Sequence, residues 1–154
     1  MDLWFLAVGK LRPAYREACD DYLRRLGRRG KVHEVEVREA ARAPTRAVQR
    51  SEEAERLRAR IPARALVVAL AREGSGLTSA GLAERLAHWE TQARPLAFLL
   101  GGSTGLDEAL IAEAAFRWSL GPLTLPHELA RVLVAEQLYR AGTILRGEPY
   151  HKGR

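Results

Sequence analysis

Two glycine- and proline-rich segments in the C-terminal half carry residue types that could hold a small polar ligand. The first is the turn Leu100-Gly-Gly-Ser-Thr-Gly105, which joins an apolar run to a predicted helix. Glycines allow positive φ and let the backbone approach a ligand closely, and the free amides at a helix start can face a polar group. The motif is short, so an ordinary strand-to-helix turn accounts for it equally well.

The second segment is Ser119-Leu-Gly-Pro-Leu-Thr-Leu-Pro-His127, a largely apolar loop with two prolines. Such a loop is rigid, so it can present backbone amides and carbonyls to an adenine edge while apolar side chains cover the faces of the base. The alternative is a buried connector before a helix, because proline is favoured in a first helical turn on structural grounds alone. His127, at the end of the loop, is expected to cap that helix or to orient a backbone group.

Other familiar chemistries leave little trace in the chain. The four histidines lack metal-ligand spacing, and Cys19 is the only cysteine, so we expect no metal site. There is no Walker A loop and no G-x-G-x-x-G fingerprint. We also expect no nucleophile elbow of the G-x-S-x-G type, so nothing is expected to mark a nucleophile.

The charge balance favours a polyanionic partner without requiring one. The chain has a formal net charge of +6, with 25 basic residues against 19 acidic ones. Only Lys10, Lys31 and Lys152 are lysines, and the other basic residues are arginines. Arginine suits phosphate better than lysine does, because its planar guanidinium can donate two parallel hydrogen bonds to phosphate oxygens. Ordinary solvated helix faces would give a similar composition, so nucleic-acid binding stays open on charge alone.

Short apolar runs alternate with helical patterns along the 154 residues. The predicted strands are residues 3–8, 32–37, 65–70 and 95–100, and the predicted helices are 13–27, 45–60, 107–115 and 128–145, with another marked by Leu82, Leu86 and Trp89. Residues 72–76 are expected to form a loop, and residues 116–125 to mix strand and loop. This alternation predicts an α/β fold, a mostly parallel sheet with helices on both faces.

The chain shows no repeat or linker that would divide it, so we expect one domain over residues 1–154. The apolar stretch Leu3 to Val8 is too short to span a membrane and lacks a basic leader. A lone cysteine suits a cytoplasmic protein.

Four motifs in the C-terminal half follow one another in a specific order. They are Leu99-Leu-Gly-Gly-Ser-Thr-Gly-Leu106, Trp118-Ser-Leu with Leu123-Thr-Leu-Pro-His127, Arg131-Val-Leu-Val-Ala-Glu-Gln-Leu-Tyr-Arg140, and Pro149-Tyr-His151. Together with Leu6-Ala-Val-Gly-Lys10 and Tyr22-Leu-Arg-Arg25, this set resembles the RlmH family, small SPOUT methyltransferases of the bacterial large ribosomal subunit. The resemblance covers nearly the whole chain.

The resemblance implies features of the fold that periodicity does not reveal. SPOUT proteins thread the C-terminal segment through a loop to make a deep trefoil knot, an exception to the rule that chains stay unknotted. The resemblance also implies a homodimer, with S-adenosylmethionine bound in a bent shape at the knot. The expected fold is therefore a SPOUT fold, a mostly parallel sheet flanked by helices with a C-terminal knot.

By the same resemblance, cofactor contacts come from the end of one strand, from the glycine turn and from the loop before the last helix. The matching residues are Leu70, Gly102, Gly121, Pro122, Leu123, Thr124, Leu125 and Pro126. The glycine turn departs from the family, in which proline and an acidic residue often follow the glycine pair. Gly121-Pro122 likewise stands where Ser-Ala is common.

The activity implied is methyl transfer from S-adenosylmethionine to N3 of a pseudouridine in 23S rRNA, within the ribosome or large subunit. The sulfonium already has a good leaving group, so the enzyme mainly needs to position the reactants. The N3 proton must also leave, so a base, or a cation near the resulting anion, would help.

The C-terminal tail carries residue types suited to that proton and to RNA. His151 has a pKa range suited to proton transfer, and Tyr150 can stack on a base. Arg140 can bind phosphate or pair with Glu136 on the same helix. The alternative is that residues 149–151 only anchor the chain end against a partner subunit.

Two other functions stay open. A SPOUT enzyme could act on tRNA or on another rRNA base, and a map of the methylated base would separate these. A noncatalytic ribosome-binding protein could keep the fold without turnover, and its cofactor affinity would reveal this. We expect no appended RNA-binding domain in a chain this small, and we therefore expect recognition of a large assembled substrate by shape.

Overall fold

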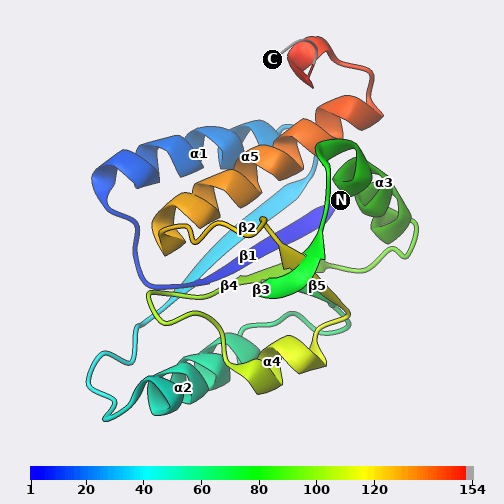
Figure 1. Cartoon of the computed structure of the whole chain (residues 1–154). Coiled ribbons are helices and arrows are strands. Elements are labelled where there is room, and N and C mark those ends of the chain that lie inside the picture. Colours follow the sequence, from blue (N-terminus) through cyan, green and yellow to red (C-terminus); the bar gives the residue numbers. More distant parts are fainter. Residues whose placement is uncertain (152–154) are drawn as a thin grey trace.

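Within residues 1–151, which this computed structural model describes, five parallel strands form one sheet in the order β2-β1-β4-β3-β5. The strands are β1 (Asp2–Val8), β2 (Lys31–Val37), β3 (Leu66–Gly76), β4 (Leu96–Leu100) and β5 (Phe116–Ser119). Because every paired neighbour is parallel, the carboxyl ends of the strands meet at one edge of the sheet. At that edge the chain leaves β1, β4 and β5 for the helices that follow them (Figure 1).

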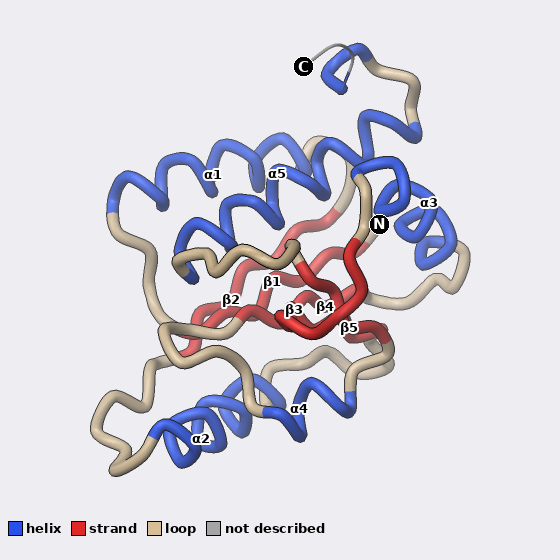
Figure 2. Tube along the Cα trace, viewed as in Figure 1, coloured by secondary structure: helices blue, strands red, loops and turns tan. Residues whose placement is uncertain are grey.

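Helices cover both faces of the sheet (Figure 2). One face bears α1 (Pro13–Gly27), α3 (Ser79–Glu90) and α5 (His127–Leu145), and the other bears α2 (Arg46–Arg58) and α4 (Glu108–Glu113). A short 3₁₀ helix, η1 (Pro149–His151), follows α5. The α/β alternation and the mostly parallel sheet expected from the sequence are confirmed.

One expectation, the loop over residues 72–76, is wrong, because β3 continues through them. The pairing of β3 with β5 breaks register between Leu70 and Ser75, so the strand bulges and then pairs with β5 again. Gly74 passes so close to β5 that an added Cβ would lie 2.7 Å from the carbonyl carbon of Arg117. A composition typical of a loop here reflects a close approach between two strands, which glycine permits.

Hydrophobic layers on the two faces of the sheet hold the helices in place. β4 is the central strand, and all five of its side chains are buried. On the face of α5, the Phe98 ring lies edge-on to Trp118 at 6.2 Å between centroids. Phe5 and Trp89 contact the same ring. On the opposite face, Leu57 of α2 is buried in a second cluster.

The last helix, α5, packs against α1, α3 and the sheet. Val134, Ala135 and Leu138 are fully buried along it. A helix that is apolar around much of its circumference is buried on several sides, as the sequence of α5 predicts.

All five strands belong to one sheet, as expected for a single domain. The extent of that domain over residues 1–154 and the deep trefoil knot stay predictions. Across residues 1–151, no helix is both long and apolar enough to cross a membrane.

Candidate functional site

A cavity of about 530 Å³ lies at the carboxyl ends of β4 and β5, beside the bulge of β3. Ligands of parallel sheets bind at this edge, and small-molecule sites typically measure roughly 300–1,000 Å³. The glycine turn at residues 100–105 and the loop at residues 119–127 both line the cavity. The structure therefore brings together the two segments that the sequence singles out.

Most residues assigned to the cofactor by resemblance lie in the wall of this cavity. They are Leu70, Gly102, Gly121, Leu123, Thr124, Leu125 and Pro126. Pro122 does not line it, although both of its chain neighbours do. These residues are thus gathered at one place, and their contact with a cofactor stays a prediction.

The glycine turn is closed too tightly for side chains inside it. The Gly105 N–H donates to the Gly102 carbonyl over 3.1 Å, and the two residues form an isolated bridge. A Cβ on Gly101 would lie 2.5 Å from the carbonyl carbon of Gly105, whose φ is 79°. The turn leads into α4, where Asp107 accepts hydrogen bonds from two backbone N–H groups of the first helical turn. At its glycine positions, this wall therefore presents backbone rather than side chains.

The loop before α5 is shaped by Ser119 and Gly121. The Ser119 hydroxyl accepts from the Gly121 N–H at 3.1 Å and donates to the Gly121 carbonyl at 3.3 Å. Gly121 has a φ of 117°, which side chains rarely adopt. Further along, Leu123 is 77% exposed, the most exposed of the large hydrophobic residues. The loop thus combines a fixed start with an apolar side chain that nothing in the described chain covers.

Thr104, in the glycine turn, contributes a polar atom without a partner. Its Oγ1 is buried and makes no hydrogen bond within the described chain, and the residue lines the cavity. An unsatisfied buried hydroxyl costs about 1–3 kcal/mol. A ligand that hydrogen-bonds Thr104 would remove that cost, so the wall suits a ligand with polar groups as well as apolar surface.

The glycine turn also has the G-x-S-x-G spacing of a nucleophile elbow, contrary to the expectation that nothing marks a nucleophile. Ser103 stands at the serine position, between β4 and α4. His127 lines the same cavity, but within the described chain no hydrogen bond joins Ser103 to a histidine. A serine nucleophile needs a base that accepts its hydroxyl proton, so the arrangement around Ser103 does not indicate a hydrolase.

The start of α5 is fixed by Glu128, and the expected cap by His127 is wrong. α5 follows Pro126, whose side chain has no acceptor, and no side-chain capping bond forms. Glu128 instead accepts from the backbone N–H of Arg12 at 2.7 Å and from its guanidinium at 2.8 Å. These bonds, the backbone one first, hold the pKa of Glu128 below its ordinary value. A negative charge also suits the N-terminus of a helix.

A buried arginine, Arg131, ties α5 to β2. It is only 3% exposed, and its guanidinium pairs with the carboxylates of Glu36 and Glu34. It also donates to the Gly9 carbonyl over 3.1 Å. Arg16 of α1 binds the same two carboxylates. This network neutralises a buried cation and holds the first turns of α5 beside the cavity.

Two of the predicted catalytic residues, Arg140 and Tyr150, donate hydrogen bonds to the same carboxylate, that of Glu136. The Glu136 carboxylate accepts from the Arg140 guanidinium at 2.7 Å and from the Tyr150 hydroxyl at 3.1 Å. The guanidinium also lies 5.0 Å from the centre of the Tyr150 ring. Burial raises the pKa of Tyr150 above its ordinary value, so its hydroxyl stays protonated at neutral pH. Of the two roles left open for Arg140, the structure contains the pair with Glu136.

This tail cluster lies far from the cavity of its own chain. Ala130 lines the cavity, and Arg140 follows it along α5, which at the helical rise of 1.5 Å per residue places them about 15 Å apart. Neither Arg140 nor Tyr150 lines the cavity. The side chain of His151, the third predicted catalytic residue, lies outside the described residues. One chain therefore does not bring the described tail residues onto this cavity.

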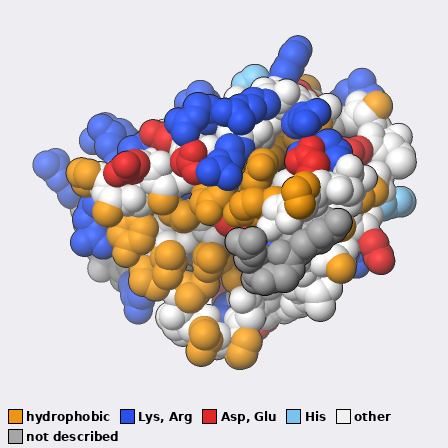
Figure 3. Space-filling view, turned by 90° about the horizontal axis from the view of Figure 1, so that it is seen from above, with side chains coloured by type: hydrophobic (Ala, Val, Ile, Leu, Met, Phe, Trp, Pro, Cys, Tyr) orange, Lys and Arg blue, Asp and Glu red, His pale blue; other side chains and the backbone are white. Residues whose placement is uncertain are grey.

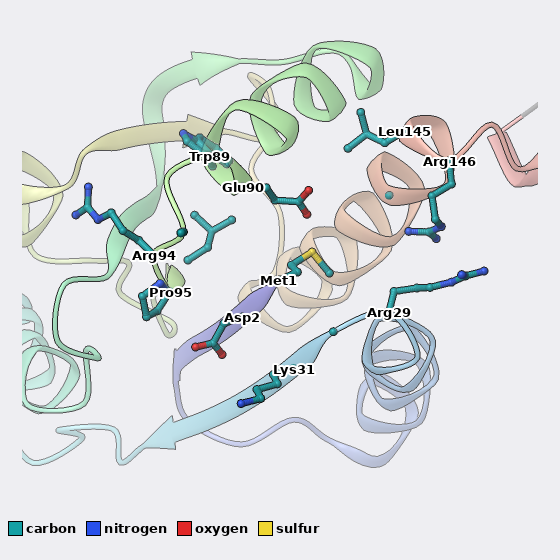
Figure 4. A pocket seen from close by; sticks show the side chains of 14 residues that line it. Met1, Asp2, Arg29, Lys31, Trp89, Glu90, Arg94, Pro95, Leu145 and Arg146 are labelled. Carbon is teal, nitrogen blue, oxygen red and sulfur yellow. The ribbon is translucent and has the colours of Figure 1, made fainter.

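A larger cavity of about 810 Å³ lies at the opposite edge of the sheet (Figure 4). Met1, Lys31 and Leu145 surround it, from the starts of β1 and β2 and the end of α5. Arg94 turns away from its centre and donates to two backbone carbonyls. Its lining has no counterpart of the glycine turn, and parallel sheets bind ligands at the other edge. We therefore place the candidate cofactor site at the carboxyl ends of the strands.

Hydrophobic side chains gather on the face of the molecule that bears α1 and α5, as the view from above shows (Figure 3). Leu145, at the end of α5, is 43% exposed. Contiguous apolar surface of this kind marks interaction sites on soluble proteins.

The sequence is similar over its length to one family of methyltransferases. A family profile described as "Predicted SPOUT methyltransferase" matches residues 1–151. A relative from Anaeromyxobacter sp. (strain Fw109-5), named Ribosomal RNA large subunit methyltransferase H, is 46% identical over 153 residues, which cover 99% of this chain and 100% of the relative. A relative of the same name from Xanthomonas euvesicatoria pv. vesicatoria is 41% identical over 150 residues, 96% of each chain.

Solved structures share the fold at low sequence identity. A probable methylase family protein from Haemophilus influenzae Rd KW20 is 12% identical, with a TM-score of 0.56 over 98% of this chain and 70% of that one. A probable methyltransferase from Bordetella pertussis Tohama I is 18% identical, with a TM-score of 0.51 over 90% of this chain and 95% of that one. These likenesses support the α/β architecture alone.

Proposed function

Because the chain belongs to the RlmH family of SPOUT methyltransferases, we propose that it methylates N3 of a pseudouridine in the 23S rRNA of the large ribosomal subunit. The proposed methyl donor is S-adenosylmethionine, and the proposed substrate is the assembled ribosome or large subunit, in the cytoplasm. The observation that carries the proposal is the cavity at the carboxyl edge, because its walls are the turn and the loop that bear the family motifs. The relatives' names, which specify large-subunit rRNA, support the substrate.

S-adenosylmethionine fits the residues that are present. The cavity has the size of a small-molecule site, an apolar wall that includes Leu70 and Leu125, and the unpartnered Thr104 hydroxyl. Leu70, Gly102 and the loop from Gly121 to Pro126 would hold the cofactor, mostly through backbone. When bound, it supplies a methyl group on a sulfonium centre with a good leaving group.

The first task of the protein is positioning. The closed glycine turn and the Ser119–Gly121 hydrogen bonds order both walls before a ligand arrives, so binding sacrifices less conformational entropy. Holding the methyl group and the acceptor nitrogen in line then lowers the barrier to transfer. Apolar side chains that line the cavity, such as Leu125, would exclude water from it once the cofactor is bound.

The second task, removal of the N3 proton, is assigned to the tail. His151 would take the proton, because its ordinary pKa lies near neutrality. Arg140 would stabilise the anion that forms on the uracil ring. Tyr150, whose raised pKa keeps it protonated, would stack on the base or donate a hydrogen bond to it.

A homodimer would unite these two tasks. Arg140 lies about 15 Å along α5 from the cavity of its own chain, so a second copy must supply the tail if the tail acts on the cofactor site. The apolar face along α1 and α5 and the exposed Leu123 offer surface for such a partner. We therefore propose that each cavity is completed by the tail of the other subunit.

Methyl transfer onto intact ribosomes tests the proposed function. Purified protein is incubated with S-adenosylmethionine labelled in its methyl group and with ribosomes from a strain that lacks this methylation, and the labelled base is mapped. Label on a pseudouridine of 23S rRNA is expected, with little on isolated short stem-loops. Label on tRNA or on another rRNA base would move the target. No label together with no cofactor binding would leave a noncatalytic ribosome-binding protein.

A further inference from the structure

Two arginines that pair with no carboxylate of the described chain stand in the wall of the proposed cofactor cavity. Arg46 and Arg72 both line it, and both are exposed. Among the described residues, neither forms a salt bridge. No motif in the sequence indicates either residue. Two such cations at one opening raise the local concentration of an anionic partner.

Arg46 is held at the opening by the start of α2. It is the first residue of that helix, and the preceding Thr45 accepts a hydrogen bond from the Val48 N–H at 3.1 Å. One turn later, Arg50 donates to the Thr104 carbonyl over 3.4 Å, which ties α2 to the glycine turn. The position of Arg46 beside the cavity is therefore built into the fold.

Arg72 is held there by the bulge of β3. The bulge spans the break in register between Leu70 and Ser75, so Arg72 leaves the ladder with β5. The close approach of Gly74 to the Arg117 backbone fixes the shape of this bulge. The two arginines thus reach one cavity from separate, independently braced elements.

The surroundings of this pair are basic. Residues 38–45, which join β2 to α2, and the first five residues of α2 together include four arginines and a single acid, Glu39. Glu73 is the acid next to Arg72 in the chain. The excess of cations over the stretch that includes Arg46 favours a polyanion over a singly charged metabolite.

We propose that Arg46 and Arg72 bind backbone phosphates of the rRNA on either side of the target nucleotide as its base enters the cavity. The inference rests on the proposed function and names how the substrate is held. A base that leaves its stack must have its backbone fixed, and the guanidinium is suited to phosphate oxygens. Such contacts set register and affinity without reading sequence. The carboxylate of S-adenosylmethionine is the alternative anion for these two arginines, and the test distinguishes it from RNA phosphate.

The test compares Arg46→Ala, Arg72→Ala and the double variant with Arg60→Ala. Arg60 is a matched control, since it is exposed, has no carboxylate partner in the described chain and does not line the cavity. For each protein, kcat/KM on ribosomes is measured from 50 to 200 mM KCl, about the range in which phosphate contacts dominate salt dependence. Affinity for S-adenosylmethionine is measured separately by calorimetry.

Each single variant is expected to lower kcat/KM at low salt by roughly threefold to tenfold and the salt slope by about 0.7–1, with additive effects in the double variant. Arg60→Ala and all cofactor affinities should match wild type. Unchanged slopes beside an active wild type would overturn the inference alone. Cofactor affinity weakened in parallel would overturn it too, and would assign the arginines to the cofactor carboxylate. A wild type that methylates no ribosomal RNA would overturn the proposed function and this inference together.

Discussion

Replacing Gly101 by alanine tests whether the closed glycine turn forms the cofactor site. The added Cβ would lie 2.5 Å from the carbonyl carbon of Gly105 and 2.8 Å from the Leu106 nitrogen. Both contacts are with backbone, so no flexible side chain can move aside, and the turn must open. Gly76 provides the matched control, because a Cβ there would meet nothing within 4 Å.

The expected loss of stability follows from the contacts of the added Cβ with backbone. Forcing an extra carbon into a packed site costs about 1–3 kcal/mol. In a chain of this size each kcal/mol shifts Tm by roughly 2–4 °C, so we expect Gly101→Ala to melt several degrees below wild type. Displacing the wall by several tenths of an ångström also disturbs the cofactor contacts, and we expect at least about a tenfold loss of S-adenosylmethionine affinity, or 1.4 kcal/mol.

Calorimetric titration with S-adenosylmethionine, together with thermal unfolding, makes the comparison. Gly76→Ala is expected to bind the cofactor like wild type and to unfold within about 0.5 kcal/mol of it, as most surface substitutions do. If Gly101→Ala binds the cofactor with wild-type affinity while its Tm falls, the turn is structural and the site has been misplaced. An unchanged Tm would refute the packing argument itself.

Three further predictions concern α5 and the tail. Arg131→Met should lower the free energy of unfolding in urea by about 1–3 kcal/mol, less than for a fully buried pair because Arg16 still neutralises the two carboxylates; wild-type stability would contradict the role of the network. Folding lowers the pKa of Glu128, so its ionised carboxylate stabilises the folded state above its unfolded pKa, and this stabilisation is lost as the pH falls through the lower folded pKa. Glu128→Gln should therefore make the free energy of unfolding fall less steeply between pH 6 and 3. A fall as steep as in wild type would count against the Arg12 contact. Tyr150→Phe removes the hydrogen bond to Glu136 and should lower kcat on ribosomes by roughly threefold to tenfold while the free energy of unfolding falls by no more than about 1 kcal/mol; a stability loss with full turnover would make Tyr150 only an anchor.

The arrangement of strands and helices was largely predictable because burial leaves a direct trace in sequence. The apolar runs that become β3 and β4 are continuous, as strands covered on both faces must be. The extension of β3 to Gly76 was not predictable, because residues 72–76 have the composition of a loop. Only the path of β5, which brings the Arg117 backbone against Gly74, shows why glycine is needed there.

The candidate site was predictable only where motifs lie close in sequence. The glycine turn and the loop before α5 stand out because glycine and proline restrict backbone in recognisable ways. Arg46 and Arg72 carry no such signal, since a cavity-lining arginine and a solvated one look alike until the fold places them. The network of Arg131 with Glu36 was hidden for the same reason, because its members lie far apart in the chain.

Mapping the methylated base on ribosomes shows whether this protein methylates large-subunit rRNA and whether the cavity serves that reaction. Ribosomes from a strain that lacks the modification are treated with the purified protein and S-adenosylmethionine, and the 23S rRNA is digested and analysed by mass spectrometry. We expect one new methyl group, on N3 of a pseudouridine, that is lost or strongly reduced with Gly101→Ala and retained with Gly76→Ala. A 23S rRNA without any new methyl group, from protein that binds the cofactor, would contradict the proposed function.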